Sequence, residues 1–137
     1  MNIALTASDK KKELMVQFCI AYGGILQKHN VCATATTGKL ISDITGIKVF
    51  RFLRGSAGGS EQIAARIAYN EIDALFFFRD PMKQLSEESE EWTLLRLCDI
   101  HNIPVATNIA PAEILIQAID RGDLDWREGY DRSKQLF

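Results

Sequence analysis

The sequence contains few of the residues that build metal centres and disulfide frameworks. Among its 137 residues are three cysteines and two histidines. Cys19, Cys32 and Cys98 are odd in number and show no CxxC spacing, which argues against both a disulfide framework and a zinc site. We interpret them as small core residues of a protein in a reducing compartment.

Long apolar runs and an excess of charge are also missing. The apolar runs are short, as at residues 74–78, so no segment is expected to span a membrane. The N-terminal stretch MNIALTASDKKK carries its charges after its apolar residues, the reverse of a secretory signal. The net charge of −2 gives no indication of nucleic acid or of an anionic membrane as a partner. We therefore expect a cytoplasmic protein with neither partner.

The remaining composition is that of one soluble domain, residues 1–137. Apolar residues make up 47% and charged residues 25%, and a chain of this length can bury a core. Short apolar segments alternate with segments of helical periodicity. The pattern predicts strands at 3–5, 31–35, 47–53, 72–78 and 103–107, and helices at 9–25, 37–45, 61–70, 87–101 and 112–120.

This alternation favours an α/β fold, a single-domain, doubly wound, five-stranded, mostly parallel sheet with helices on both faces. The strand at 72–78 is apolar throughout and is expected to be central. Gly46 is expected to close the second helix. In the helix at 87–101 we expect Trp92, Leu95 and Cys98 to face the core.

In such a sheet, ligands bind beyond the carboxyl ends of the strands. The junctions there are residues 6–9, 34–38, 54–61, 79–81 and 107–108. Each of the five carries a hydroxyl group, a glycine or an acid. Their convergence on one edge of the sheet predicts the functional site.

One junction has the character of an anion site. Thr34, Ala35, Thr36 and Thr37 lead into a helix, whose free N–H groups and dipole favour an anion together with the hydroxyls. A helix cap needs one hydroxyl rather than three, which favours the anion site over capping alone. Lys12, one turn into the first helix, is placed to reach the same anion, although by itself it would read as a solvated surface lysine. The spacing is not that of a P-loop.

A second junction is rich in glycine. Gly55, Gly58 and Gly59 precede the helix at 61–70. Three glycines so close together favour a cradle for a phosphate or carboxylate, although a tight turn with positive φ at one or two of them is the alternative.

Two acids end neighbouring strands. Asp9 and Asp80 follow the first and fourth strands, which a doubly wound sheet places side by side. Paired carboxylates beside a phosphate suit proton abstraction next to a carbonyl, if one pKa is raised. The alternative is that Asp9 is a helix first-turn acid and that Asp80 caps an Asp-Pro turn. His29 and His101 fall at the amino ends of strands, away from this edge, so neither a catalytic histidine nor a metal cluster is expected.

Taken together, the junctions resemble those of methylglyoxal synthase. The resemblance is densest in IALTASDKKKELM, ATATTGKLISDITG, GSAGGSEQIA, IDALFFFRDP, LLRLCDIHNIPVATN and the closing YDR. Related domains occur within the much longer chains of carbamoyl-phosphate synthetase and the purine-pathway cyclohydrolase. The resemblance implies a doubly wound homohexamer, a lyase that converts dihydroxyacetone phosphate to methylglyoxal and inorganic phosphate without a cofactor.

The resemblance also assigns roles by position. Asp9 and Asp80 match acids that line the family's site. The positions that would hold the phosphate are Lys12, Thr34, Thr36, Thr37 and Gly55.

The sequence departs from the family at the proton-transfer positions. The family loop is typically GPMGGDQQ, and Ser60 stands where its aspartate acts as the base. Glu61 follows in place of a glutamine, and Glu87 stands at the spacing of the family's catalytic histidine. Ser8 replaces the histidine before the first acid, and Arg54 replaces the serine before the first glycine.

Two main hypotheses follow, an active synthase-like enzyme and a catalytically impaired phosphometabolite-binding or regulatory protein on the same scaffold. A third is an oligomer of unrelated chemistry that keeps the anion pocket. The candidate catalytic residues are Asp80, Glu61, Asp9 and Ser60. The candidate phosphate-binding residues are Ser8, Lys12, Thr34, Ala35, Thr36, Thr37, Arg54, Gly55, Gly58, Gly59 and Glu87. Because Ser60 cannot act as a strong base without a partner, we expect weak or absent synthase activity and a gain on Ser60→Asp.

Overall fold

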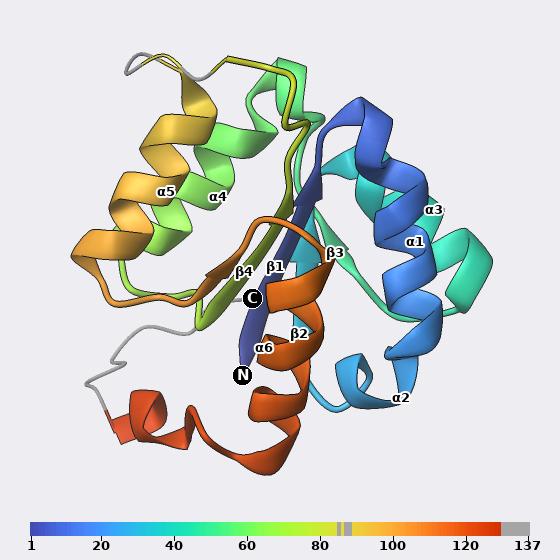
Figure 1. The fold of residues 1–137 in the computed structure, drawn as a ribbon, viewed down its shortest axis with the longest axis vertical. Helices are drawn as coiled ribbons and strands as arrows, with labels where there is room; N and C mark the ends of the chain where they lie inside the picture. The colour runs from blue at the N-terminus through green and yellow to red at the C-terminus, as the bar shows by residue number, and fades with distance from the viewer. Residues whose placement is uncertain (85, 87–88, 130–137) are drawn as a thin grey trace.

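The computed structural model describes residues 1–84, 86 and 89–129. Its strands are β1 (Asn2–Ala7), β2 (Asn30–Ala33), β3 (Phe50–Arg51), β4 (Ala74–Phe78) and β5 (Val105–Ala106). Its α-helices are α1 (Lys12–Ala21), α2 (Gly23–Leu26), α3 (Ala35–Thr45), α4 (Gly59–Ala68), α5 (Glu90–Ile100) and α6 (Ile109–Arg121), with short 3-10 helices η1 (Asp9–Lys11), η2 (Gly55–Ala57) and η3 (Asp125–Gly129) (Figure 1).

The five strands form one parallel sheet in the order β3-β2-β1-β4-β5. β1 and β4 are fully buried and pair from Ile3 with Ala74 to Ala7 with Phe78. Continuous apolar strands of this kind belong to a sheet that is covered on both faces. The expected α/β fold and the interior position of the fourth strand are therefore confirmed.

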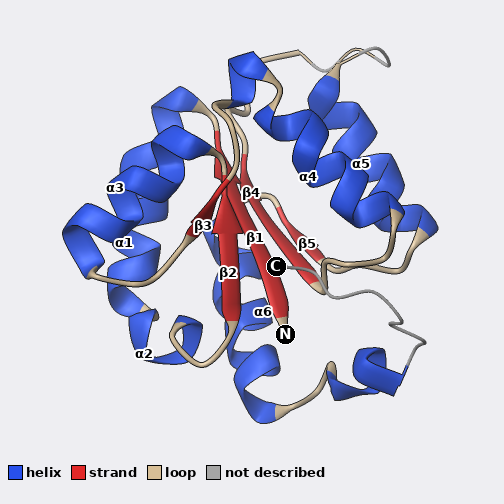
Figure 2. Cartoon of the chain, turned by 180° about the vertical axis from the view of Figure 1, so that it is seen from behind, coloured by secondary structure: helices blue, strands red, loops and turns tan. Residues whose placement is uncertain are grey.

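Helices cover both faces of the sheet, which separates two apolar cores. Phe76 and Phe78 of β4 pack with α1, α3 and α6, whereas Leu75 and Phe77 pack with α4 and α5. Alternate residues of a strand point to opposite faces, so one strand supplies both cores. Figure 2 shows α1 and α3 on one side of the sheet and α4 and α5 on the other.

Two details of the fold differ from the sequence predictions. The third strand spans only Phe50–Arg51, whose residues are exposed, because it is an edge strand with one neighbour. On α5 the buried residues are Leu94 and Cys98, and the side chain of Trp92 is 39% exposed. The expected inward position of Trp92 is wrong. Gly46 does end α3, with φ 73°.

The amino-terminal edge of the sheet is closed by a buried ion pair. Arg127 of η3 and Asp73 are both fully buried, and the guanidinium Nε lies 3.3 Å from Oδ1 of Asp73. The same guanidinium donates to the carbonyl of Asn102 at 2.7 Å. The imidazole Nδ1 of His29 lies 3.1 Å from the N-terminal amine of Met1 at this edge. Functional chemistry is left to the opposite, carboxyl edge.

No helix in the described part of the chain is long and apolar enough to cross a membrane.

Candidate functional site

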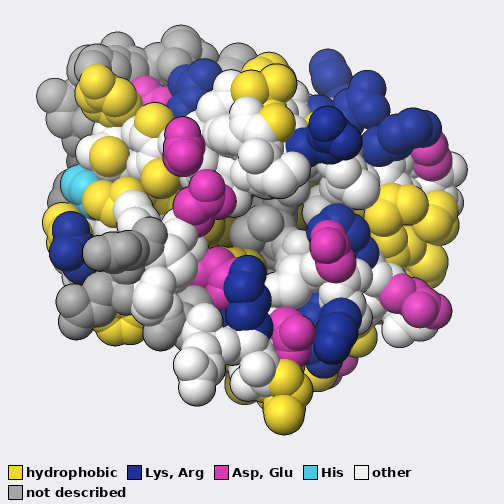
Figure 3. Space-filling model, turned by 90° about the horizontal axis from the view of Figure 1, so that it is seen from above, with side chains coloured by type: hydrophobic (Ala, Val, Ile, Leu, Met, Phe, Trp, Pro, Cys, Tyr) yellow, Lys and Arg dark blue, Asp and Glu magenta, His cyan; other side chains and the backbone are white. Residues whose placement is uncertain are grey.

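A cavity of about 730 Å³ opens at the carboxyl edge of the sheet, where the strand ends meet the beginnings of α3, α4 and α5. Seen from above, basic and acidic side chains are interspersed on this face of the molecule (Figure 3). The predicted residues that line the cavity are Ser8, Asp9, Lys12, Thr34, Thr36, Arg54, Gly55, Ser60 and Asp80. These predicted residues therefore lie together at the edge of the sheet where the sequence predicts the site.

One side of the cavity carries Lys12 and the threonines. The ammonium of Lys12 donates to the carbonyl of Ala7 at 3.1 Å and to Oδ1 of Asp9 at 2.7 Å, and its side chain is only 20% exposed. Thr34 begins α3 without capping it through its side chain; its hydroxyl lies 3.4 Å from that of Thr37. Because Thr34 does not use its hydroxyl as a helix cap, the threonine hydroxyls are available to an anion. The ammonium of Lys12 lies on the same side of the cavity and adds a positive charge.

The glycine loop contributes less to this side than its sequence indicated. Gly58 has φ 106°, and a Cβ at Gly59 would overlap the backbone carbonyls of Leu53 and Arg54. Neither glycine lines the cavity, and the N–H group of Gly59 donates to Arg54 within the loop at 2.8 Å. These two glycines serve the tight turn, and Gly55 is the loop glycine that faces the cavity.

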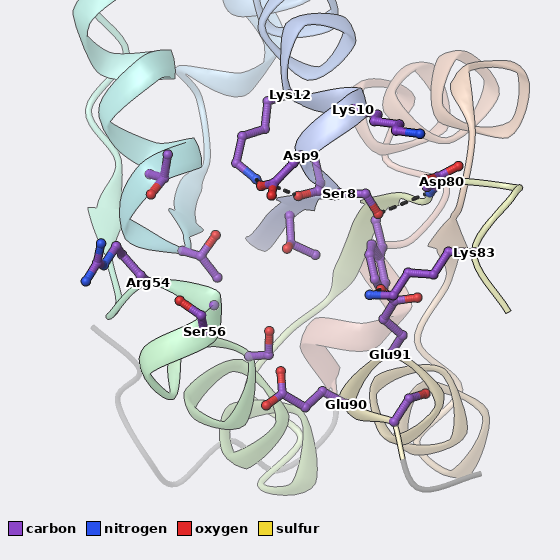
Figure 4. Close-up of a pocket in the computed structure, with 18 residues that line it drawn as sticks. Ser8, Asp9, Lys10, Lys12, Arg54, Ser56, Asp80, Lys83, Glu90 and Glu91 are labelled. Atoms are coloured by element: carbon purple, nitrogen blue, oxygen red, sulfur yellow. Dashed lines mark hydrogen bonds and ion pairs between the residues drawn. The ribbon is translucent and has the colours of Figure 1, made fainter. Parts of the chain in front are cut away.

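The other side of the cavity carries carboxylates. Asp80 follows β4, and its N–H donates to the hydroxyl of Ser8 at 3.1 Å (Figure 4). Ser8 therefore begins η1 without capping it, because its hydroxyl links the ends of β1 and β4 instead. Oδ1 of Asp80 accepts from the N–H of Met82 at 3.0 Å, the bond expected of an Asp-Pro turn.

Two acids of α5 complete this side and were not among the predicted site residues. Glu91 is largely buried and pairs with Lys83 at 3.0 Å. Glu90 has no ion pair or hydrogen bond with the residues that the structure describes, and its carboxylate is turned into the cavity in Figure 4. The signal that would have found them is Ser89, which begins the helix and accepts from the N–H of Trp92 at 3.1 Å.

Asp9 is held as an anion. Its carboxylate is fully exposed, and the hydrogen bond and positive charge of Lys12 lower its pKa below the ordinary value. A carboxylate with a lowered pKa is a weaker base. Asp9 therefore suits charge balance and the positioning of Lys12 better than proton abstraction.

Several predicted residues do not reach the cavity. Glu61 lies in the first turn of α4 with an exposed side chain and does not line it. Thr37 is buried beneath Thr34, and Ala35, Gly58 and Gly59 support the turns without lining the cavity. Glu87 lies outside the described residues.

Within the described residues, no group of three or more histidine, cysteine, aspartate or glutamate side chains is arranged to hold a metal ion.

Comparison with known proteins identifies close relatives. The model of the MGS-like domain matches residues 15–107. The chain is 62% identical over 128 residues to a methylglyoxal synthase of Caldicellulosiruptor saccharolyticus, covering 93% of this chain and 91% of the relative. A methylglyoxal synthase of Oceanobacillus iheyensis is 53% identical over the same shares of the two chains. The crystal structure of a methylglyoxal synthase from Elizabethkingia anophelis NUHP1 superposes with TM-score 0.77 at 40% identity, covering 84% of this chain and 76% of that one.

Proposed function

The chain belongs to the methylglyoxal synthase family, and on this basis we propose that it converts dihydroxyacetone phosphate to methylglyoxal and inorganic phosphate. The observation that carries the proposal is one cavity lined by cations and hydroxyls, Lys12 and the threonines among them, together with carboxylates. This pairing suits a substrate that has a phosphate at one end and an acidic C–H bond at the other.

The phosphate is bound by Lys12, the hydroxyls of Thr34 and Thr36, and the backbone at Gly55. Asp9 balances the charge of Lys12 until the substrate enters. As the C–O bond to the phosphate breaks, negative charge grows on the departing oxygen. A largely buried ammonium stabilises that charge more strongly than an exposed one.

At the other end, a carboxylate removes a proton from the hydroxymethyl carbon beside the carbonyl. The electron pair of that C–H bond forms an enediolate, which expels the phosphate with the electrons of the C–O bond. The resulting enol takes up a proton at the carbon that carried the phosphate and becomes methylglyoxal. Ser60 faces the cavity but cannot supply the base.

Glu90 is the base that the geometry favours. Asp9 is paired with Lys12, and Glu91 is paired with Lys83. Glu90 begins α5, which packs against α4, the helix that carries Ser60. The carboxylate of Glu90 can therefore act as the base that Ser60 cannot supply. Asp80 is the second candidate, since it also lines the cavity.

Methylglyoxal formation by the purified protein tests the proposal. We expect Glu90→Gln to lower kcat by about 10²–10⁴-fold, the usual contribution of a general base, and Asp80→Asn to have a smaller effect. Glu113→Gln, an exposed acid of α6, is the matched control. Ser60→Asp is expected to raise kcat by adding a carboxylate. If Asp80→Asn abolishes turnover and Glu90→Gln does not, Asp80 is the base.

The alternative of a catalytically impaired metabolite-binding protein rests on the changed proton-transfer positions, above all Ser60. The methylglyoxal synthases at 53–62% identity over most of the chain give it no support. This alternative would be supported if the protein binds phosphate but leaves dihydroxyacetone phosphate unchanged.

We also propose a cytoplasmic homo-oligomer, most simply a hexamer. Apolar side chains exposed on α1, α3 and the β3 segment are available for contacts between subunits: Ile20, Ile44, Phe50 and Leu53. Sedimentation that gives a monomer at micromolar concentration would contradict the assembly without affecting the reaction.

A further inference from the structure

A second cavity, of about 410 Å³, lies at the same edge of the sheet but on its other face. It is bounded by Leu14 of α1, Phe78 of β4 and Ile109 of α6, all of which pack in the core of that face. The catalytic cavity borders Phe77, in the core of the opposite face, and also Ala7 at the end of β1. The two cavities share no lining residue.

The charged groups that line this second cavity are cations. Lys11 and Arg79 contribute them, and none of the described carboxylates lines it. Neither side chain forms an ion pair with the residues that the structure describes. Two cations facing one cavity repel each other, and an anion between them would offset that repulsion.

The side chain of Arg79 also has a hydrogen-bond donor without a partner among the described residues. Its Nε is completely buried and has no partner among the described residues. A buried donor without a partner is rare and costs free energy. The backbone N–H of Arg79 is bonded to the carbonyl of Thr107 at 3.2 Å, so the residue itself is firmly placed. The guanidinium of Arg79, a residue that lines the cavity, therefore has a donor that none of the described residues satisfies.

The N-terminus of α6 strengthens the field at this place. α6 has 13 residues, and its positive dipole end begins at Asn108, which lines the cavity. The side-chain oxygen of Asn108 accepts a hydrogen bond from the N–H group of Ala110, and Pro111 has no N–H group. The helix therefore contributes a positive electrostatic potential, and the two cationic side chains donate the hydrogen bonds to an anion.

We propose that this cavity is a second binding site for a small tetrahedral oxyanion, a phosphate or a phosphoryl group, held by Lys11, Arg79 and the hydroxyl of Thr107. Arginine binds such anions through two parallel N–H donors, and lysine adds a point charge. The site is separate from the catalytic cavity, although successive residues of the chain line different cavities. Lys10, Lys12 and Asp80 line one, whereas Lys11, Arg79 and Pro81 line the other.

The test is a titration of the ¹⁵N-labelled full-length protein with inorganic phosphate at constant ionic strength, set with chloride. The amides of Thr36 and Gly55 report on the catalytic cavity, and those of Thr107 and Ile109 report on the second. Two independent saturation curves are expected. Arg79→Met should weaken the curve at Thr107 and Ile109 by about tenfold or more, the loss expected for a hydrogen bond to a charged group.

The controls separate the two sites. Lys12→Met should weaken the curve at Gly55 and leave that at Ile109, and Arg96→Met, an exposed arginine of α5, should change neither. If Arg79→Met fails to fold, Lys11→Met replaces it, because Lys11 is only half-buried. The proposal is overturned if Thr107 and Ile109 do not respond, if they follow the Gly55 curve in every variant, or if Arg79→Met and Lys11→Met leave their curve unchanged.

Discussion

Replacing Lys12 with methionine removes the positive charge that lies on the same side of the catalytic cavity as the threonines, while keeping the apolar stem. The side chain of Lys12 is only 20% exposed, and its ammonium donates to the carbonyl of Ala7 and to Asp9 at the cavity wall. A hydrogen bond from such a group to a charged ligand contributes about 1.5–3 kcal/mol. This corresponds to a fall in kcat/KM of about 10–150-fold, from steady-state assays with dihydroxyacetone phosphate.

Lys39→Met is the matched control for this variant. Lys39 also pairs with an aspartate, Asp43, at 2.7 Å, but its side chain is 64% exposed and lies outside the cavity. It should lose only the stability of a surface pair, about 0.3–0.5 kcal/mol, with unchanged kinetics. In Lys12→Met the pKa of Asp9, lowered by that lysine, should return towards its ordinary value in a carboxyl NMR titration. Equal kinetics for the two variants would refute the phosphate-binding role of Lys12.

Three further predictions concern stability and reactivity. Arg127→Met leaves Asp73 buried without its partner and should lower the free energy of unfolding in urea by about 3–5 kcal/mol; a loss below about 1 kcal/mol would show that the pair is not buried as described. Burial raises the pKa of all three cysteine thiols to about 12, so a disulfide reagent at pH 8 should modify none in the native protein and all three after denaturation. Burial, and secondly the N-terminal amine, lower the pKa of His29, so the unfolded chain takes up the proton first as the pH falls. Stability should therefore be full above about pH 6.5 and decrease below it, and His29→Gln should flatten this dependence; an unchanged slope would contradict the assignment.

The adjacency of β1 and β4 was predictable because both segments are strongly patterned. β1 and β4 are short, apolar and each followed by a helix, which in a doubly wound sheet makes them neighbours. That placement brought Asp9 and Asp80 to one cavity. The prediction depended on topology, which tolerates errors of one or two residues in the ends of each element.

Side-chain direction was less predictable because it depends on those ends. The helix expected at residue 87 begins at Glu90, and each residue of error turns a helical side chain by about 100°. Trp92 was therefore assigned inward, and Glu90 was not recognised as facing the cavity. The glycine loop shows a different limit. Its composition could not separate Gly58 and Gly59, needed by the turn, from Gly55, which lines the cavity.

The most direct test of the account is NMR of dihydroxyacetone phosphate with the purified protein in D₂O, following methylglyoxal by ¹H and inorganic phosphate by ³¹P. If the protein catalyses the proposed reaction, both products appear in equal amounts, at a rate proportional to protein concentration. Each methylglyoxal then carries one deuterium in its methyl group, because the enol takes its last proton from solvent. Products that form no faster than in the protein-free sample would contradict the proposed function.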